Sequence, residues 1–521
     1  MDTPRRDVLK MLGLAAILPI PVRNALAQPA RSFVFASYSA YDSVDPHTVF
    51  DASRAGARFN LYDGLYRYVD NPPKLIPWLA EGYSISEDRK SYTFRLKRDV
   101  IFHDGKHVTA DDVVYSIERI LALNKGPSPL YQGIIKPGTT VALDPYTVVF
   151  NLSSPSAIFL STVPDIVVVN RDLVKSHEID GDWGEKWLSR NEAGSGSYKL
   201  VRFDPAIGWS AQRFEQHFAG FGSDPIDNVE FRNVLETNTR VLGLMRGDYH
   251  GADGFLPYDQ VLRLEQSPNV QIIDQESMRV FLVALNNAKP PLDDVHFRRA
   301  LSYSFDYEGY IASVMKGSVT RNPGPLPVTM WGSPPDLKGY TYDLNKAADE
   351  LKKAKLQLRP LTIVAIAGQP ESEQAGILFQ SSLRQIGIDA TYEATPWPIL
   401  VNRLTSQETR PDAIPFWKST FYVDPNNWVG EGFGSRYQGQ RSLSYYNNPE
   451  FDKLLDKALI SDNQAERKTL YEEMTRMVVD DAAGIFVYNT RWHGTYSKKV
   501  SGIRFSPTNN GQDLRWASFK P

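Results

Sequence analysis

Hydrophobic and polar residues alternate in several short segments of the first 190 residues. Residues 92–96 place Tyr92, Phe94 and Leu96 on one face, which is typical of a half-buried β-strand, and residues 146–152 form a second apolar segment of strand length. Asp104-Gly105 is a tight-turn pair. Thr109 and Asp112 have the spacing of a capping-box variant, which predicts the start of a helix. This region is therefore expected to be α+β with antiparallel hairpins.

The hydrophobic pattern changes in the second half of the chain. Residues 361–366 predict a strand, residues 371–386 a helix and residues 388–394 another strand, which together predict a parallel βαβ unit. Asn448-Pro449 predicts the start of a helix whose apolar stripe holds Phe451, Leu454, Leu455, Ala458 and Leu459. A second helix with Leu470, Met474, Met477 and Val478 follows, and then a strand over residues 485–488. The tail from residue 494 is strand-like and too short to be a domain, so it is expected to return to an earlier lobe.

The composition narrows the class of protein. With 521 residues, of which 42% are hydrophobic and 23% charged, the chain has ordinary globular usage and length for about three or four domain-sized units. A formal net charge of −3 argues against a general nucleic-acid binder. The absence of cysteine excludes disulfides, thiolate metal sites, cysteine nucleophiles and a lipidated cysteine.

Residues 1–27 have the pattern of an export signal. Arg5 and Arg6 precede an apolar stretch that is too short to span a bilayer, and Ala25 and Ala27 form a small-x-small cleavage site. The paired arginines resemble a twin-arginine motif. Pro4 and Val8 depart from the residues usual in that motif, so an ordinary secretory route stays open. We expect the mature chain to be periplasmic, soluble and not lipid-anchored.

Motifs of catalysis and cofactor binding are missing from the sequence. There is no Gly-x-Ser-x-Gly elbow, phosphate-binding loop, dinucleotide-binding glycine motif or His-Glu-x-x-His pair. His103 and His107 flank a hairpin turn without further metal-ligand candidates nearby. The sequence therefore predicts a protein that is not an enzyme and has no cofactor and no metal site.

Several segments, in order along the chain, carry a family resemblance. They are Ser43–Val-Asp-Pro-His47, Ala80-Glu-Gly-Tyr83, Val100-Ile-Phe-His-Asp-Gly105, Thr109-Ala-Asp-Asp-Val113, Gly194-Ser-Gly-Ser-Tyr198, Leu285-Asn286 with Pro291-Leu-Asp-Asp294, Asp424-Pro425 and Tyr446-Asn-Asn-Pro-Glu-Phe-Asp452. Together they resemble the family 5 extracellular solute-binding proteins, the peptide, nickel and opine receptors of ABC importers. The resemblance covers nearly the whole mature chain.

The resemblance implies an α/β fold of two lobes, a Venus-flytrap periplasmic binding protein with an extra α+β subdomain on the first lobe. We expect lobe I to comprise residues 28–275 plus 490–521, with the subdomain at about 62–190, and lobe II to comprise residues 276–489. A peptide or similar small polar solute would bind between the lobes, which close on it. The expected partners are this solute and the ABC permease with its ATPase subunits, and the chain is expected to be a monomer that binds no nucleic acid.

The resemblance also implies where the solute is contacted. In the family, two lobe II tryptophans face the cleft, and they match Trp397 and Trp417, although either ring could instead fill the core. The first-lobe loop that faces the cleft matches Tyr38 and Tyr41. The further candidates are Tyr422 and Asp424, with Tyr131, Ser195, Arg279 and Lys418 as weaker ones.

One departure from the family concerns the solute's amine. Receptors that hold a peptide ammonium place an aspartate about three residues after the second tryptophan, whereas here the first acid after Trp417 is Asp424. A free peptide N-terminus is therefore not expected to be held in the usual way. Cations near this segment could instead serve an anionic solute, unless they are ordinary surface charges: Arg279, Arg410, Lys418, Arg436 and Arg441. An exported hydrolase and a receptor for a metal chelate are the alternative functions.

Overall fold

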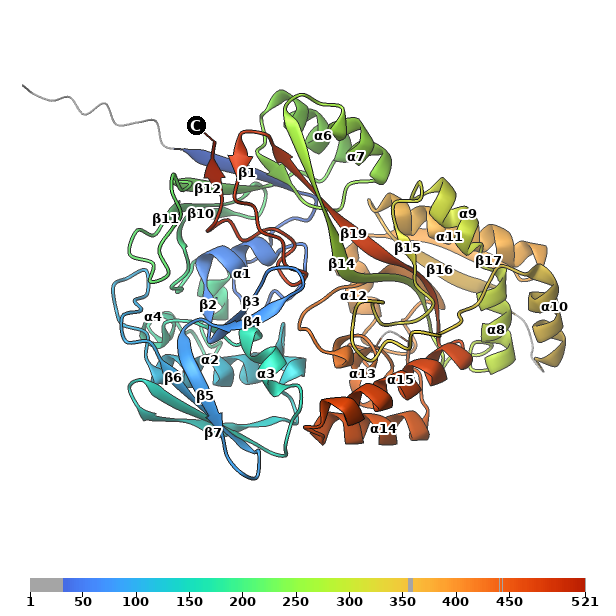
Figure 1. The fold of residues 1–521 in the computed structure, drawn as a ribbon, viewed down its shortest axis with the longest axis horizontal. Helices are drawn as coiled ribbons and strands as arrows, with labels where there is room; N and C mark the ends of the chain where they lie inside the picture. The colour runs from blue at the N-terminus through green and yellow to red at the C-terminus, as the bar shows by residue number, and fades with distance from the viewer. Residues whose placement is uncertain (1–30, 355–358, 440, 443, 521) are drawn as a thin grey trace, which may run out of the picture.

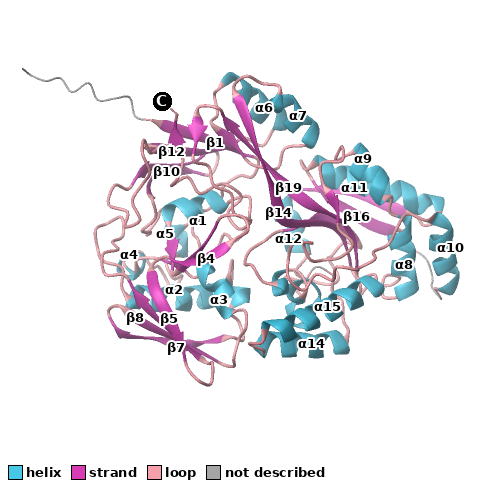
Figure 2. Ribbon diagram, viewed as in Figure 1, coloured by secondary structure: helices cyan, strands magenta, loops and turns pink. Residues whose placement is uncertain are grey.

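The computed structural model describes residues 31–354, 359–439, 441–442 and 444–520, and the proposed export signal lies outside them. The chain forms two lobes side by side, joined by two long strands (Figures 1 and 2). Within the described residues one eleven-stranded sheet runs through both lobes. The expected two-lobed α/β architecture is thus confirmed.

The lobe I part of this sheet combines parallel and antiparallel strands. β1 (Ser32–Ser37) pairs in parallel with β12 and β13, and β10 and β11 extend the sheet beyond β12 as antiparallel strands. The other elements of this part are β10 (Tyr198–Asp204), β11 (Gly208–Arg213), β12 (Asn228–Asn233), β13 (Gly251–Ala252), α1 (Ala55–Leu61), α4 (Arg171–Lys175), α5 (Glu185–Leu188), α6 (Thr237–Arg246) and α7 (Tyr258–Glu265).

The subdomain of lobe I contains a separate antiparallel sheet in the order β5-β6-β8-β7. Its strands are β5 (Ala80–Ile85), β6 (Ser91–Leu96), β8 (Thr147–Leu152) and β7 (Ile135–Asp144), so both strands predicted here are confirmed. Helix α2 (Ala110–Leu123) begins after Thr109, whose backbone N–H donates to the Asp112 carboxylate at 2.9 Å. The smaller elements are β2 (Asp63–Gly64), β3 (Tyr66–Val69), β4 (Lys74–Pro77), β9 (Val167–Val168) and α3 (Phe159–Thr162).

Lobe II is built on the predicted βαβ unit. β16 (Leu361–Ile366), α11 (Pro370–Gln385) and β17 (Ala390–Thr395) follow in order, and β16 pairs in parallel with both β17 and β18 (Ala413–Lys418). Helices cover the sheet, and the predicted pair near the C-terminus is α14 and α15. The remaining elements are α8 (Val295–Ser304), α9 (Tyr307–Ser313), β15 (Thr320–Arg321), α10 (Leu344–Lys353), α12 (Trp397–Arg403), α13 (Gly430–Phe433), α14 (Pro449–Ile460) and α15 (Gln464–Asp480).

Strands β14 (Val270–Leu285) and β19 (Gly484–Ser497) connect the lobes as one antiparallel pair. The sequence predicted a short strand over 485–488 followed by a separate tail, but β19 continues unbroken to Ser497. Its polar middle hides the strand from the sequence pattern, because polar as well as apolar residues are buried there and pair with β14. The domain boundaries near residues 275 and 489 stay predictions, and they fall within this pair.

The end of the chain packs on lobe I. Leu514 and Ala517 are buried in the same apolar cluster as Phe33 and Trp209, and β20 (Val500–Ser501) pairs with β21 (Ser518–Phe519). No helix in the described part of the chain is long and apolar enough to cross a membrane.

Candidate functional site

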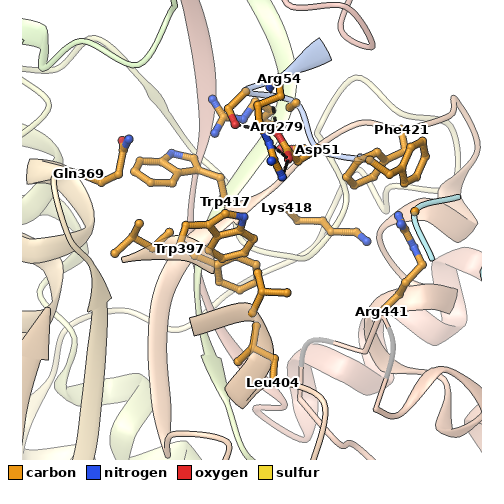
Figure 3. Close-up of a pocket in the computed structure, with 18 of the residues that line it drawn as sticks. Asp51, Arg54, Arg279, Gln369, Trp397, Leu404, Trp417, Lys418, Phe421 and Arg441 are labelled. Atoms are coloured by element: carbon orange, nitrogen blue, oxygen red, sulfur yellow. Dashed lines mark hydrogen bonds and ion pairs between the residues drawn. The ribbon is translucent and has the colours of Figure 1, made fainter. Parts of the chain in front are cut away.

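A cavity of about 420 Å³ lies between the lobes, within the range of about 300–1,000 Å³ that holds small ligands. Its walls come from the segments that follow β1 and β13 in lobe I and β16, β17 and β18 in lobe II. Ligands of open α/β sheets bind beyond the carboxyl ends of parallel strands, so the sheet order itself places this site. The lining includes Tyr38, Phe50, Asp51, Arg54, Phe255, Arg279, Gln369, Trp397, Arg410, Trp417, Lys418, Phe421 and Arg441. Figure 3 labels Asp51, Arg54, Arg279, Gln369, Trp397, Trp417, Lys418, Phe421 and Arg441 among them.

Two aromatic rings of the lobe I wall, those of Tyr38 and Phe255, lie next to each other. Tyr38 follows directly after β1, and its backbone N–H donates to the Asp253 Oδ2 atom at 2.6 Å. The ring centroids of Tyr38 and Phe255 are 4.9 Å apart. The carboxylate of Asp253 also accepts from the backbone N–H of Phe255 at 3.1 Å, so it fixes both segments at the edge of the cavity.

The lobe II wall carries two half-buried tryptophans. Trp397 is the first residue of α12, and Trp417 lies near the end of β18. The Trp417 ring packs edge-on against Phe281, with centroids 5.0 Å apart. Flat rings that are held on one side and open on the other offer apolar area to a ligand at low entropic cost.

Arg279 projects into the cavity from the crossover strand β14. Its guanidinium lies 4.4 Å from the ring centroid of Phe255 and 5.4 Å from that of Trp417, so it contacts rings from both lobes. Its Nε atom is buried without a hydrogen-bond partner among the described residues. Desolvation lowers the pKa of Arg279 to about 10, which leaves it a cation at neutral pH.

Two cations share one carboxylate on the lobe II side. The Lys418 Nζ atom lies 3.2 Å from the Glu431 Oε2 atom, and the Arg441 Nε atom donates to that same oxygen. Tyr422 donates to the other oxygen, Oε1, at 2.8 Å. Desolvation, with a smaller contribution from Arg441, lowers the pKa of Lys418 to about 8.

The contacts between the lobes include a stacked aromatic pair. Phe50 of lobe I and Phe421 of lobe II have ring centroids 4.7 Å apart, and the Arg441 guanidinium lies 4.5 Å from the Phe421 centroid. The backbone N–H of Val423 donates to the hydroxyl of Tyr68 at 3.3 Å across the same boundary. The two lobes therefore contact each other beside the cavity.

Comparison with known proteins places the chain in a family. Residues 74–440 match the family model described as bacterial extracellular solute-binding proteins, family 5 Middle. The chain belongs to the family 5 extracellular solute-binding proteins. It is 31% identical over 511 residues to the probable D,D-dipeptide-binding periplasmic protein DdpA of Escherichia coli, covering 95% of this chain and 96% of that one.

Two further relatives show how the family varies. Heme-binding protein A of Haemophilus influenzae is 27% identical, with 93% of this chain and 92% of that protein covered. The periplasmic binding protein DppA of Helicobacter pylori, solved with the peptide STSA, shares the fold at a TM-score of 0.85 and 24% identity, covering 94% of this chain and 98% of that one. This family 5 protein is therefore a solute-binding receptor of an ABC importer and not an enzyme.

Four of the predicted contact residues line the cavity of this family 5 protein. A fifth one, Lys418 at the end of β18, lines it as well; the other four are Tyr38, Trp397, Trp417 and Arg279. The described residues contain no cluster of three or more histidine and carboxylate side chains that could hold a metal ion.

Tyr41, Tyr422 and Asp424 do not line this cavity, and their role as ligand contacts stays a prediction. Tyr41 is fully buried, with its ring edge-on to Trp209 at 6.1 Å between centroids. Tyr422 is fully buried and bonded to Glu431. Asp424 accepts from the backbone N–H of Asn426 at 3.0 Å, and its two oxygens each lie 2.8 Å from guanidinium nitrogens of Arg467.

The weaker candidates Tyr131 and Ser195 also lie outside the cavity lining. The Tyr131 hydroxyl donates to the carbonyl oxygen of Thr162 at 2.7 Å inside the subdomain core. The Ser195 hydroxyl donates to the Asp63 carboxylate at 2.9 Å. Arg436, named among the cations for an anionic solute, pairs with Asp456 on the surface.

Sequence reasoning missed part of the site. Gln369 lies three residues after β16, so the rule that ligands sit beyond parallel strand ends could have found it. Phe50, Asp51, Arg54 and Phe255 lie in irregular segments, and nothing in their sequence pattern distinguishes them from other loop residues.

Proposed function

We propose that this receptor captures a short peptide, or a similar small polar solute, between its lobes and delivers it to the ABC permease by closing around it. The observation that carries the proposal is a cavity whose aromatic walls come from different lobes: Tyr38 and Phe255 on one side, Trp397 and Trp417 on the other. A solute that touches both walls binds the closed state better than the open state and shifts the population toward it. The permease can then recognise closure and not the solute itself.

The peptide class is supported by the relatives. A probable D,D-dipeptide-binding protein is among them, and its 31% identity extends over nearly the whole of both chains. Thermal unfolding and isothermal titration with a dipeptide panel test the proposal. A binding dipeptide at about 100 times its Kd stabilises the folded state by about 2.7 kcal/mol and raises Tm. A panel of dipeptides and their derivatives that leaves Tm unchanged and gives no titration heat overturns the peptide assignment.

We also propose that the mature protein is a soluble periplasmic monomer without a lipid anchor. The paired Arg5 and Arg6 ahead of an apolar stretch support export, and the lack of cysteine supports the absence of an anchor. Export should fail when both arginines are replaced by lysine. Normal export of that double variant removes the twin-arginine route but leaves the periplasmic location in place.

A further inference from the structure

The charges that line the cavity are unbalanced. Among the described residues around it, five carry cationic side chains and one, Asp51, carries a carboxylate. The cations are Arg54, Arg279, Arg410, Lys418 and Arg441. A low-dielectric cavity with excess positive charge is costly unless a ligand brings negative charge to it.

The single carboxylate of the wall is already occupied. The Asp51 Oδ1 atom accepts from the Ser53 hydroxyl at 2.7 Å and from the Arg54 backbone N–H at 2.9 Å. Its Oδ2 atom lies 2.7 Å from Arg54 Nε and 2.6 Å from Arg54 Nη2. A carboxylate has about four acceptor positions. Asp51 therefore has no position left for a ligand ammonium.

Two carboxylates behind the wall, Glu431 and Asp424, already have partners. Glu431 is shared by Lys418, Arg441 and Tyr422, and both oxygens of Asp424 are held by Arg467. Glu371 is buried at the start of α11 outside the cavity lining, where desolvation raises its pKa to about 7. Glu431 and Asp424 therefore have no free oxygen for a ligand ammonium, and Glu371 lies outside the cavity lining.

The unpaired polar atoms of the wall are donors. Arg279 Nε and Arg441 Nη2 are buried without a hydrogen-bond partner among the described residues. The same holds for Nε2 of Gln369, a side chain that is 2% exposed and that lines the cavity. A buried donor that makes no hydrogen bond destabilises the protein, so the ligand is expected to supply acceptor oxygens to these donors. The excess of cations and the unpaired donors thus both favour an anionic ligand with acceptor oxygens.

We infer that the solute is an organic anion that presents a carboxylate to Arg279 and further acceptor oxygens to Arg441 and Gln369, and that it carries no free ammonium, such as a short peptide acid with a blocked N-terminus. This inference rests on the proposed function, since it names the solute class of the same cavity. Trp397 and Trp417 contact the apolar part of such a solute, and the guanidinium of Arg279 lies close to the rings of both Phe255 and Trp417.

Isothermal titration of the purified protein with a matched set of ligands tests the inference. The set is Ala-Phe, N-acetyl-Ala-Phe and the C-terminal amide of N-acetyl-Ala-Phe. We expect N-acetyl-Ala-Phe to bind at least as tightly as Ala-Phe, and amidation to lower its affinity at least tenfold. The inference is overturned if acetylation lowers the affinity of Ala-Phe tenfold or more, or if amidation leaves the affinity unchanged.

Variants assign the effect to the cavity. Arg279→Gln should lower the affinity for N-acetyl-Ala-Phe at least tenfold, while Arg263→Gln, on the exposed face of α7, should leave it unchanged. If Arg279→Gln does not fold, Arg441→Gln is the second test variant. The Glu431 carboxylate then still has Lys418 and Tyr422 as partners. Unchanged affinity in the folded variants overturns the assignment.

Failure of the proposed function can be distinguished from failure of the inference about the anion. If no member of the set binds, peptide capture is what fails, and mass spectrometry of the solute released from gently purified protein decides the inference. An anionic solute without an amine supports it, and a solute with a free ammonium group overturns it.

Discussion

Tryptophans of lobe II occupy two different environments. Trp417 is half-buried, with one side against Phe281 and the other toward the cavity, whereas Trp428 is fully buried in the apolar core. The same truncation therefore has different consequences at the two positions. At the cavity wall it removes ligand contact, and in the core it leaves a void.

Replacement of Trp417 by alanine should weaken solute binding by about 1–3 kcal/mol, the scale of a lost aromatic anchor. The unfolding midpoint should change little, since the open side of the ring leaves little cavity. Titration and thermal unfolding of the same variant measure both quantities. Trp428→Ala is the matched control and should cost about 3–5 kcal/mol of stability. A Trp417→Ala variant that loses stability to this degree and keeps its affinity would contradict the assignment.

Lys418 predicts opposite pH dependences for binding and for stability. Its folded-state pKa of about 8 lies below the ordinary value of 10.5, so the unfolded chain binds more protons between these values. The stability of the solute-free protein should therefore rise as the pH increases from about 8 to 10.5. The affinity for an anion such as N-acetyl-Ala-Phe should fall as the pH passes about 8, because Lys418 loses its charge.

The variant Lys418→Met isolates these slopes. Glu431 keeps Arg441 and Tyr422 in this variant, so its charge stays paired. The differences between wild type and variant in denaturant unfolding and in titration, each measured from pH 7 to 10.5, give the contribution of Lys418. Equal slopes in the two proteins would show that Lys418 does not titrate in this range.

At the scale of elements, the sequence pattern predicted the helices and strands that interactions between neighbouring residues determine. The βαβ unit was predictable because the apolar strands and the amphipathic helix between them each have a distinct period. The start of α2 was predictable because Thr109 and Asp112 satisfy the helix N-terminus within one turn. The full length of β19 was not, because its polar middle is held by pairing with β14, which is distant in sequence.

The assignment of site residues had the same limit. Tyr41 lies only four residues after β1, yet its ring packs into the core with Trp209 and Phe231. Asp424 has the residue type expected for holding an ammonium, but Arg467 of α15 occupies both oxygens. Neither partner could be identified from the sequence, since each pair is formed by packing of segments distant along the chain.

The stacked pair of Phe50 and Phe421 should couple closure to binding. Single alanine variants and the double variant form a cycle in which the coupling energy for solute affinity should be about 0.5–1.5 kcal/mol, the value of an aromatic pair beyond its buried area. The pair Trp209 and Phe231, stacked at 4.3 Å within lobe I, is the control and should be coupled in unfolding free energy but not in affinity. Additive affinities for Phe50 and Phe421 would contradict a role in closure.

At the scale of the whole molecule, two long strands are the proposed hinge for closure of the lobes. β14 and β19 pass between the lobes as one antiparallel pair, with register shifts between Glu276 and Val280. Small changes in backbone angles within this pair can move the lobes as rigid bodies, since each lobe has its own buried core. Hinge closure with a cavity at the lobe boundary is thus a property of the topology.

The most direct test measures the distance between the lobes with and without solute. The variant carries Glu87→Cys, in the β5–β6 turn, and Glu473→Cys, on α15. Because the chain contains no cysteine of its own, spin labels attach at these two positions alone. Double electron–electron resonance should give a longer, broader distance distribution for the solute-free protein. Saturation with N-acetyl-Ala-Phe, or with the solute released from the purified protein, should shift it to one shorter, narrower distance. An identical distribution in both states would contradict capture by closure of the two lobes.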